Sequence, residues 1–363
     1  MKKLLFKLIF GTLIVVVSSN SFVSAETSKF KVGVVIPLSG PIAEYGIAAR
    51  NGIEIAQTEH PELFKNIEFI FEDNQWNAKL AVTTFNKLRS NDKVSLIYNW
   101  GNPTTEAVAP LAERYKIPLL GMSADSSVAI GKEFVTLTTN PTMAFAEKLA
   151  DYLKRKNYKK LGVVLAENSY VSGIYKDLKT QLDSDQNIEI IDNYNLSETD
   201  FRSTVTKLRY RKYDALGVFL ITGQVSEFYK QLADQNVKVP TFGTDFFENS
   251  TEIRMARGGM EGAVYTHLGV NDDFKAEYIK RFGNDLQLAY AGNSHDIVLM
   301  IGKLFNSGKN QSASQIMDKI RTAEEFQGAC GNFIFKNTKD AGPYISFPIY
   351  TKLIKNGIVE KIF

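Results

Sequence analysis

The sequence has few of the residues that build metal centres and disulfides. Its 363 residues include one cysteine, Cys330, and three histidines, His60, His267 and His295. A single cysteine excludes an intrachain disulfide, and we expect Cys330 to be a small buried apolar side chain. No two of the histidines have the spacing of a metal site. The sequence therefore predicts a fold that is held together by its core, without a metal.

Catalytic and phosphate-binding patterns are missing as well. The chain has no Walker loop and no dinucleotide glycine fingerprint. Residues 121–125 begin like a nucleophile elbow, but Asp125 stands where the closing glycine belongs. Ser294, His295 and Asp296 have the residue types of a catalytic triad, but neighbours on a predicted helix point in different directions. We therefore expect a binding protein that uses no cofactor, and not an enzyme.

The one segment that is typical of a targeting signal lies at the start. Lys2, Lys3 and Lys7 precede an apolar stretch over residues 8–17, and Val23-Ser24-Ala25 forms a small-residue cleavage site. This pattern predicts a secretory signal peptide over residues 1–25, cut after Ala25; an uncleaved N-terminal anchor is the alternative. No later apolar run is long enough for a membrane span. The mature protein is expected to be exported and soluble, which in a bacterium means periplasmic.

Charge of either sign is nearly balanced. The whole chain carries 43 basic and 40 acidic residues, a formal net charge of +3, and residues 1–25 hold three lysines and no acid. The mature chain is therefore neutral, which gives no reason to expect nucleic acid or an anionic membrane as a partner. The remaining 338 residues are too many for one ordinary core, so two domains are expected.

Apolar strands alternate with amphipathic helices, and the alternation starts twice. Residues 31–36, Lys-Val-Gly-Val-Val-Ile, are followed by a Ser-Gly-Pro turn and a helix; residues 160–165, Lys-Leu-Gly-Val-Val-Leu, open a second such unit. Nearly continuous apolar strands are typical of parallel sheets that are buried on both faces. We predict an α/β fold of two similar lobes without a flexible linker, which indicates a hinged cleft. Further strands are expected over residues 67–71, 94–98, 117–120, 135–137, 188–191, 215–221 and 239–242, with a hairpin-like end over 346–362.

Several motifs in this order carry a family resemblance. They are VGVVIPLSGPIAEYG over residues 32–46, Phe71-Glu72-Asp73 followed by Ala81-Val82, residues 102–110 and 117–125, and a late glycine-rich turn from Gly328 to Phe335. An exported two-lobe α/β chain with these motifs resembles the type I periplasmic binding proteins, and among them the branched-chain amino acid (Leu/Ile/Val-type) receptors of ABC importers. The resemblance implies two Rossmann-like lobes with parallel-type sheets and a multi-strand hinge. Lobe 1 would comprise residues 26–142 plus 268–340, and lobe 2 residues 143–267 plus 341–363.

The resemblance also implies a ligand pocket between the lobes. In this family, hydroxyls and backbone N–H groups of the first lobe hold the ligand's α-carboxylate, and a carboxylate of the second lobe meets its ammonium group. The positions that carry over are Tyr45, Trp100, Gly101, Asn102, Ser123, Ala124 and Asp125 in the first lobe, and Tyr170, Ile221, Thr222, Asp245 and Phe246 in the second.

Two of these positions depart from the family pattern. Asn102 stands where relatives have a serine, and Asp125 stands where a threonine is usual. An aspartate is a poor neighbour for a ligand carboxylate because like charges repel in a closed site; if Asp125 caps a helix instead, this objection weakens. Asp245 could likewise be a helix cap or a solvated loop acid. Tyr45 and Tyr170 could be plain core aromatics, and Trp100 a packed rim residue.

The expected function follows from the resemblance. A monomeric periplasmic receptor would close its lobes on a small molecule, first an amino acid or a derivative, and deliver it to an inner-membrane ABC permease. A small aromatic, amide or cationic compound is the alternative ligand. A sensory or regulatory module of the same fold, and a hydrolase that uses Asp or Ser residues in the cleft, are the alternative functions.

Overall fold

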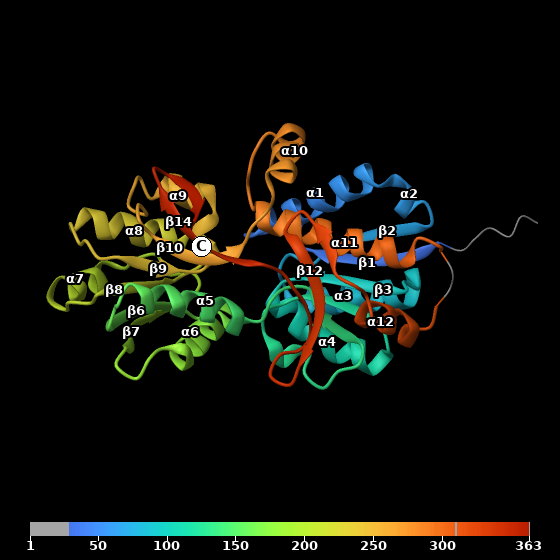
Figure 1. Ribbon diagram of the computed structural model, residues 1–363, viewed down its shortest axis with the longest axis horizontal. Coiled ribbons are helices and arrows are strands. Elements are labelled where there is room, and N and C mark those ends of the chain that lie inside the picture. The colour runs from blue at the N-terminus through green and yellow to red at the C-terminus, as the bar shows by residue number, and fades with distance from the viewer. Residues whose placement is uncertain (1–28, 309–310, 363) are drawn as a thin grey trace, which may run out of the picture.

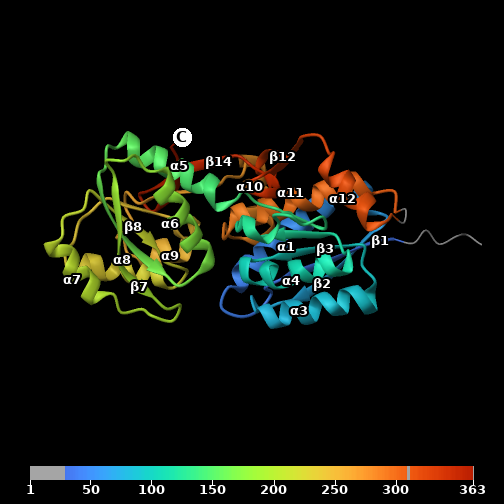
Figure 2. The ribbon, with the colours of Figure 1, turned by 90° about the horizontal axis from the view of Figure 1, so that it is seen from below.

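The computed structural model describes residues 29–308 and 311–362, so the predicted signal peptide over residues 1–25 lies outside the described residues. Figure 1 shows two α/β lobes side by side along the long axis of the molecule. Seen from below in Figure 2, each lobe has its own sheet with helices packed around it. The predicted fold class is confirmed.

The first lobe is built on an eight-stranded sheet in the order β11-β12-β13-β5-β4-β3-β1-β2. Strands β1 to β5 and β13 run parallel, and β12 pairs antiparallel with both of its neighbours. The strands are β1 (Phe30–Ile36), β2 (Ile67–Asp73), β3 (Leu96–Trp100), β4 (Leu119–Met122), β5 (Val135–Leu137), β11 (Phe326–Gly328), β12 (Gly331–Thr338) and β13 (Gly342–Ser346). The helices are α1 (Ala43–Glu59), α2 (Pro61–Phe64), α3 (Ala78–Lys87), η1 (Leu88–Asp92), α4 (Asn102–Tyr115), η2 (Ser126–Val128), α10 (Asp272–Phe282), α11 (Leu288–Phe305) and α12 (Ala313–Arg321).

The second lobe repeats this design on a seven-stranded sheet in the order β15-β14-β10-β9-β8-β6-β7. Its strands are β6 (Lys160–Ala166), β7 (Asn187–Tyr194), β8 (Ala215–Phe219), β9 (Thr241–Gly243), β10 (Val264–Leu268), β14 (Ile349–Lys355) and β15 (Ile358–Lys361). Its helices are α5 (Thr142–Arg155), α6 (Ser169–Gln181), α7 (Arg202–Tyr210), α8 (Gln224–Asp234), η3 (Asp245–Glu248) and α9 (Ser250–Met255).

Three strands, β3, β4 and β9, begin two residues later than the apolar pattern indicates, and two of them follow a proline. The runs expected over 117–120 and 239–242 include Pro118 and Pro240, and the observed strands β4 and β9 start only after them. Proline has no backbone N–H to give to a parallel ladder, so the chain joins the sheet one residue beyond it.

The chain crosses between the two sheets three times, after β5, after β10 and after β13. The side chain of Asn140, in the first crossover, donates to the carbonyl of Phe347 at 3.1 Å and accepts from its N–H at 2.9 Å, so it joins the first crossover to the third. Asn293 of α11 donates to the carbonyl of Thr138 at 2.8 Å. These buried amide groups hold the crossovers together. The exact residues at which each lobe begins and ends remain a prediction.

Helices α1 and α11 of the first lobe approach each other closely. At Gly52 of α1, a Cβ atom would lie 1.9 Å from the carbonyl oxygen of Ala291 in α11. Ile53 and Ala56, on the same part of α1, are fully buried. This contact positions the site described below, because α1 carries Tyr45 and α11 carries Tyr290 into the space between the lobes.

Replacing Gly52 with alanine should separate these two helices. The added methyl group meets backbone, which cannot turn away as a side chain can, so we expect Gly52→Ala to lower the free energy of unfolding by about 3 kcal/mol or more. Urea unfolding followed by circular dichroism measures this change. Glu54→Ala, at an exposed position of the same helix, is the control and should stay within about 0.5 kcal/mol of the parent. Equal stability of the two variants would contradict the close approach.

Candidate functional site

A cavity of about 780 Å³, including the part that is open to solvent, lies between the two lobes. It is formed where parallel strands end and helices begin, which is where α/β sheets commonly bind ligands. The residues that line it are Ile42, Tyr45, Trp76, Trp100, Gly101, Asn102, Met122, Ala124, Thr139, Phe145, Asn168, Tyr170, Ile221, Thr222, Phe246, His267 and Tyr290.

Most of the predicted site residues come together in this cavity. Those that line it are Tyr45, Trp100, Gly101, Asn102, Ala124, Tyr170, Ile221, Thr222 and Phe246. Ser123, Asp125 and Asp245 are not among the lining residues. The two aspartates are turned away by contacts that the sequence did not reveal.

Asp125 caps a helical turn. It is the N-cap of η2, and its Oδ1 accepts from the Ser127 N–H at 2.9 Å and from the Ser127 hydroxyl at 2.7 Å. The aspartate is therefore directed at its own loop. Asp125 therefore does not stand against a ligand carboxylate, and the expected repulsion between the two does not apply.

Asp245 is covered by two tyrosines. Its side chain is buried at the start of η3; the Tyr170 hydroxyl donates to Oδ1 at 2.6 Å, and the Tyr290 hydroxyl donates to Oδ2. Burial, and next the charge of Asp245, hold the pKa of both tyrosines well above the usual value, so both hydroxyls keep their protons and donate. Asp245 is thus neither a solvated loop acid nor a wall of the cavity.

Aromatic rings form much of the cavity wall and contact one another within each lobe, and the pair Tyr45–Phe246 joins the two lobes. Ring centroids lie 5.2 Å apart for Tyr45 and Tyr290, 5.4 Å for Trp100 and Tyr290, and 5.7 Å for Tyr45 and Trp100. Phe246 lies 6.1 Å from Tyr170 and 6.4 Å from Tyr45. Most of these contacts are edge to face, the arrangement that aromatic rings prefer. Tyr45 and Tyr170 are thus buried aromatics that also face the cavity.

Sequence reasoning missed several lining residues, among them Trp76, Tyr290 and His267. Trp76 follows the end of β2, so the rule that ligands bind where parallel strands end could have pointed to it. Tyr290 lies in the first turn of α11, ahead of Ser294, His295 and Asp296, the residues that the sequence analysis placed on a helix. His267 sits inside a strand that is buried throughout, and the sequence pattern does not say which face points to the cavity.

Several helices begin at the cavity, among them α1, α4, α6 and α8, and direct their partial positive charge toward it. At three of these four, a negative or accepting side chain lies at the start: Glu44 lies in the first turn of α1, Asn168 caps α6, and Glu252 accepts from two N–H groups at the start of α8. Helix α4 begins at Gly101, and no side chain in the described ranges caps it. Because Pro103 has no N–H, the N–H groups without a cap at this start are those of Asn102 and Thr104.

Two further donors lie beside the start of α4. Trp100 Nε1 and Asn102 Nδ2 are buried, and neither has a hydrogen-bond partner among the residues that the structure describes. The orientation of Asn102 is set because its Oδ1 accepts from the Ala124 N–H at 3.1 Å. A buried donor without a partner costs free energy, which an acceptor on a ligand would recover.

A buried charged group supports the opposite wall. The His267 ring lines the cavity, and its Nδ1 lies 2.9 Å from Glu248 Oε2; the Lys352 Nζ lies 2.6 Å from the same oxygen. Burial alone would raise the pKa of Glu248, but the neighbouring Lys352 and His267 lower it to about 2. Glu248 is therefore ionised at neutral pH and fixes the position of the His267 ring.

Hydrogen bonds join the lobes across the cleft. The hydroxyls of Tyr45 and Thr222 lie 2.7 Å apart, the Asn249 side chain donates to Glu44, and Ser169 donates to Glu106 at 3.2 Å. In each pair, one residue belongs to the first lobe and the other to the second. The structure is thus a closed arrangement of the two lobes.

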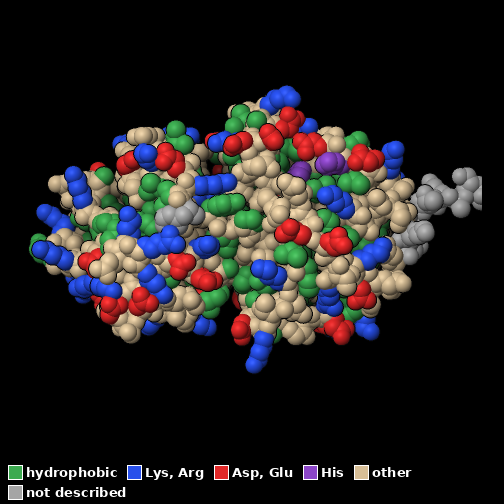
Figure 3. All heavy atoms as spheres, in the orientation of Figure 1, with side chains coloured by type: hydrophobic (Ala, Val, Ile, Leu, Met, Phe, Trp, Pro, Cys, Tyr) green, Lys and Arg blue, Asp and Glu red, His purple; other side chains and the backbone are tan. Residues whose placement is uncertain are grey.

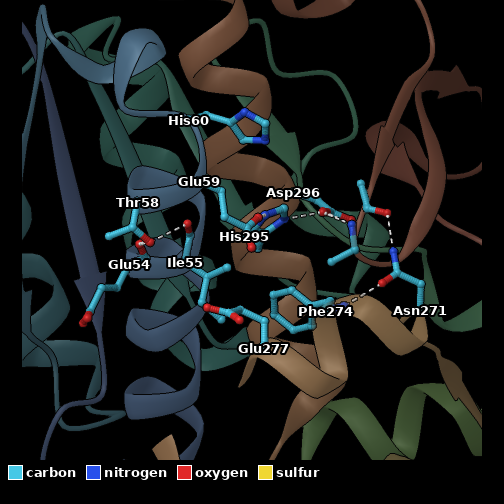
Figure 4. Close-up of polar contacts among 12 residues, drawn as sticks. Glu54, Ile55, Thr58, Glu59, His60, Asn271, Phe274, Glu277, His295 and Asp296 are labelled. Carbon is cyan, nitrogen blue, oxygen red and sulfur yellow. Dashed lines mark hydrogen bonds and ion pairs between the residues drawn. The ribbon is translucent and has the colours of Figure 1, made fainter. Parts of the chain in front are cut away.

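A second polar cluster, shown in Figure 4, lies away from the cavity. His295 Nδ1 lies 2.8 Å from Asp296 Oδ1, so the expectation that these helix neighbours do not meet was wrong: the histidine ring is long enough to turn back to the adjacent carboxylate. The Ser294 hydroxyl instead lies 2.9 Å from the hydroxyl of Tyr98. These three residues therefore do not form a triad.

Asp296 has a structural task in this cluster. Its carboxylate accepts from the N–H groups of Ala329 at 2.6 Å and of Cys330 at 2.8 Å, which holds the late glycine-rich turn against α11. Cys330 is free and buried, as predicted. Within residues 29–308 and 311–362, no group of three His, Cys, Asp or Glu side chains is arranged to hold a metal ion, and no helix has the length and apolarity to cross a membrane.

Removal of the Glu248 carboxylate should cost stability in a pH-dependent way. Its pKa in the folded protein, about 2, is below the ordinary value of 4.5, so its stabilisation is present above pH 4.5 and is lost as the pH falls toward 2. We expect Glu248→Gln to lower the free energy of unfolding by about 3 kcal/mol at pH 7, with the difference shrinking between pH 4.5 and pH 2. Urea unfolding at several pH values measures this, with the exposed Glu324→Gln as control. A difference that stays constant with pH would contradict the assigned charge.

Comparison with known proteins identifies relatives along nearly the whole chain. Residues 29–345 match the family model of the periplasmic binding proteins. The Leu/Ile/Val-binding protein BraC3 of Rhizobium johnstonii is 21% identical over 360 residues, which cover 92% of this chain and 94% of that protein.

Solved structures of the same fold hold different ligands. The substrate-binding protein LivJ of Streptococcus pneumoniae, in complex with isoleucine, superposes with a TM-score of 0.81 at 19% identity and covers 92% of this chain and 99% of LivJ. A solute-binding protein of an ABC transporter from R. palustris, in complex with 4-hydroxybenzoate, superposes with a TM-score of 0.80 at 19% identity. The superposition covers 92% of this chain and 96% of that protein. At such identities the likeness shows the fold alone.

The family match begins just before β1 and ends within β13, so it includes the first two crossovers and all the residues that line the cavity. Its members are substrate-binding proteins and not enzymes. The chain therefore belongs to the type I periplasmic binding proteins, in the family of the branched-chain amino acid receptors.

Proposed function

We propose that this protein is a periplasmic receptor that closes on a small aromatic carboxylate and delivers it to an ABC importer. The observation that carries the proposal is the wall at the start of α4. There, unpartnered N–H donors face a cavity whose lining, in the described part of the chain, has aromatic rings but no Asp, Glu, Lys or Arg.

The side chains that line the cavity favour a ligand with an aromatic ring. Seven of the lining side chains are Phe, Tyr or Trp, and they come from both lobes. A planar ring between them would bury apolar surface against faces and edges that already meet at the angles aromatic pairs prefer. A branched aliphatic side chain would gain the burial but not the ring contacts.

The electrostatics of the cavity favour a ligand that carries a carboxylate. The uncapped start of α4, Trp100 Nε1 and Asn102 Nδ2 lie on one wall, and all of them donate hydrogen bonds. Charge-assisted hydrogen bonds to an anion are stronger than those to a neutral acceptor, and the helix start adds its partial positive charge. A cationic ligand would meet the same donors and be repelled.

An α-amino acid is the second candidate, because LivJ, which has the same fold, binds isoleucine. Its ammonium group would need a partner, and the predicted partner, Asp245, is already held by the hydroxyls of Tyr170 and Tyr290. A buried ammonium group without a carboxylate is costly. The aromatic carboxylate avoids this cost, so the geometry favours the alternative ligand class over the amino acid expected first.

Closure and delivery are argued from the contacts across the cleft. The pairs Tyr45–Thr222 and Glu44–Asn249 form between lobes and would keep a bound ligand away from water. Delivery to an inner-membrane ABC permease follows from the family and from the predicted signal peptide. The permease and the monomeric state stay predictions.

A ligand screen tests the proposal. A ligand that binds the folded state raises its melting temperature by mass action. We expect benzoate and 4-hydroxybenzoate to raise the melting temperature of residues 26–363, benzamide to raise it less, and isoleucine and phenylalanine to leave it unchanged. A rise with amino acids alone would contradict the aromatic carboxylate and return Asp245 to its predicted role.

The donors at the start of α4 can be tested by removing the indole N–H of Trp100. Trp100→Phe keeps an aromatic ring but loses the indole N–H, so we expect the affinity for benzoate to fall about 10- to 100-fold, because hydrogen bonds to charged groups are worth about 1.5–3 kcal/mol. Benzamide should lose less. Isothermal titration calorimetry measures both ligands.

Trp76→Phe is the matched comparison, since Trp76 also lines the cavity but its indole N–H is not among the buried atoms without a partner. It should weaken benzoate and benzamide equally. Equal losses for the two ligands in Trp100→Phe would show that Trp100 contributes only ring contact.

A further inference from the structure

A basic groove lies at the far end of the second lobe, beside the end of α7. In Figure 1 this helix is at the left edge of the molecule, and in Figure 3 Lys and Arg side chains stand out there. The groove has a volume of about 1010 Å³, including the part open to solvent. Its charged lining comes from Arg209, Arg211, Lys212 and Lys238, with Tyr213 between them. We call this surface the α7 groove.

The α7 groove is separate from the cavity between the lobes. Its residues lie just before β8 and β9, at the edge of the sheet where the parallel strands begin. The cavity lies at the opposite edge, where the strands end. A ligand in the cavity therefore does not reach the groove, and an inference about the groove does not rest on the ligand proposed above.

Three of the four cations of the groove are not neutralised by nearby acids, whereas the fourth, Arg211, interacts with Tyr213 and with the charges of Glu189 and Asp192. Arg209, Lys212 and Lys238 have no carboxylate within 4 Å in the described portion of the chain. Asp214, the one acid in the lining, accepts from the backbone N–H groups of Lys159 at 2.7 Å and of Lys160 at 2.8 Å. Its charge is thus directed into the start of β6.

The neighbouring acids on β7 are engaged as well. Glu189 accepts from the Tyr213 hydroxyl at 2.6 Å, and Asp192 is paired with Lys207 at 2.7 Å. The groove therefore keeps an excess of positive charge, although the mature chain is neutral overall. The net charge of the mature chain, which is zero, does not indicate this local excess of positive charge.

An exposed aromatic residue borders these cations in the sequence. Tyr210 is 83% exposed, the highest value among the exposed large hydrophobic residues of the described part of the chain, and it lies between Arg209 and Arg211 in the sequence, outside the lining of the groove itself. Tyrosine is favoured at the boundary between lipid headgroups and acyl chains, where its ring and its hydroxyl both find suitable surroundings. Lysine and arginine beside it are attracted by anionic headgroups.

We propose that the α7 groove binds the surface of a bilayer that contains anionic phospholipids, with Tyr210 at the headgroup boundary and Arg209, Arg211 and Lys212 on the phosphates. A nucleic acid fits less well, because the basic tract is too short to follow a phosphate backbone over several nucleotides. The contact would keep the receptor near a membrane while its cavity stays free.

Vesicle co-sedimentation tests this proposal on residues 26–363. We expect binding to vesicles of phosphatidylcholine with 30% phosphatidylglycerol, no binding to phosphatidylcholine alone, and loss of binding at 0.5 M salt. Arg209→Gln/Arg211→Gln/Lys212→Gln should weaken partitioning about 10- to 100-fold, and Tyr210→Ala should weaken it less. Unchanged melting temperatures would show that these variants are folded.

The matched control removes three exposed lysines from α5 and α6 of the same lobe, as Lys148→Gln/Lys176→Gln/Lys179→Gln. It changes the net charge by the same amount and should bind vesicles like the parent. Equal loss in the control would overturn the proposal, since binding would then follow net charge. Equal sedimentation with both vesicle types, or binding to a DNA oligonucleotide without binding to vesicles, would overturn it too.

Discussion

The carboxylate of Asp245 determines much of the chemistry of the cavity, because two tyrosines from opposite lobes hold it. Tyr170 belongs to α6 of the second lobe and Tyr290 to α11 of the first, and both donate to the same buried side chain. A buried charge needs such donors, since it has lost its hydration. Once Asp245 is satisfied in this way, the rings of the two tyrosines, and not the carboxylate, face the ligand. The interaction therefore joins the lobes and removes the negative charge from the cavity wall.

The helix starts around the cavity complete this electrostatic arrangement. Glu44, Asn168 and Glu252 lie at the starts of α1, α6 and α8, whereas no described side chain caps α4. Because the potential of a helix end falls off within about one turn, an anion gains from the start of α4 only when it lies at that wall. The buried donors of Trp100 and Asn102 lie beside this helix start and distinguish it from the other helix starts at the cavity. Asp125 supports this wall indirectly, since it is engaged with Ser127 and does not oppose an anion.

The fold could be predicted well from the sequence because buried parallel strands and amphipathic helices have local patterns. The repeated Lys-x-Gly-Val-Val segment marked the first strand of each lobe, and these are β1 and β6. The cavity could be predicted where it follows strand ends, as for Trp100 and Asn102. Tyr290 and His267 could not be found in this way, since they reach the cavity from a late helix and a late strand whose faces depend on how the chain crosses between lobes. The cap formed by Asp125 with Ser127, two residues away, is local and was one of the two alternatives for this residue, whereas the direction of Asp245 depends on Tyr170, 75 residues away, which no local pattern contains.

The same sheet topology explains why one lobe can carry two unrelated surfaces. In the second lobe, helices α6 and α8 begin at the ends of β6 and β8, so positive helix ends gather at the cavity. The chain then returns to the opposite edge through α7 and α8, where the strands begin and where lysine and arginine at helix ends are favoured by the negative end of the helix dipole. Lys207 and Arg209 lie in that last turn of α7. A basic surface at this edge is therefore compatible with helix stability. It lies at the opposite edge of the sheet from the ligand cavity, so substitutions at one surface leave the residues of the other in place.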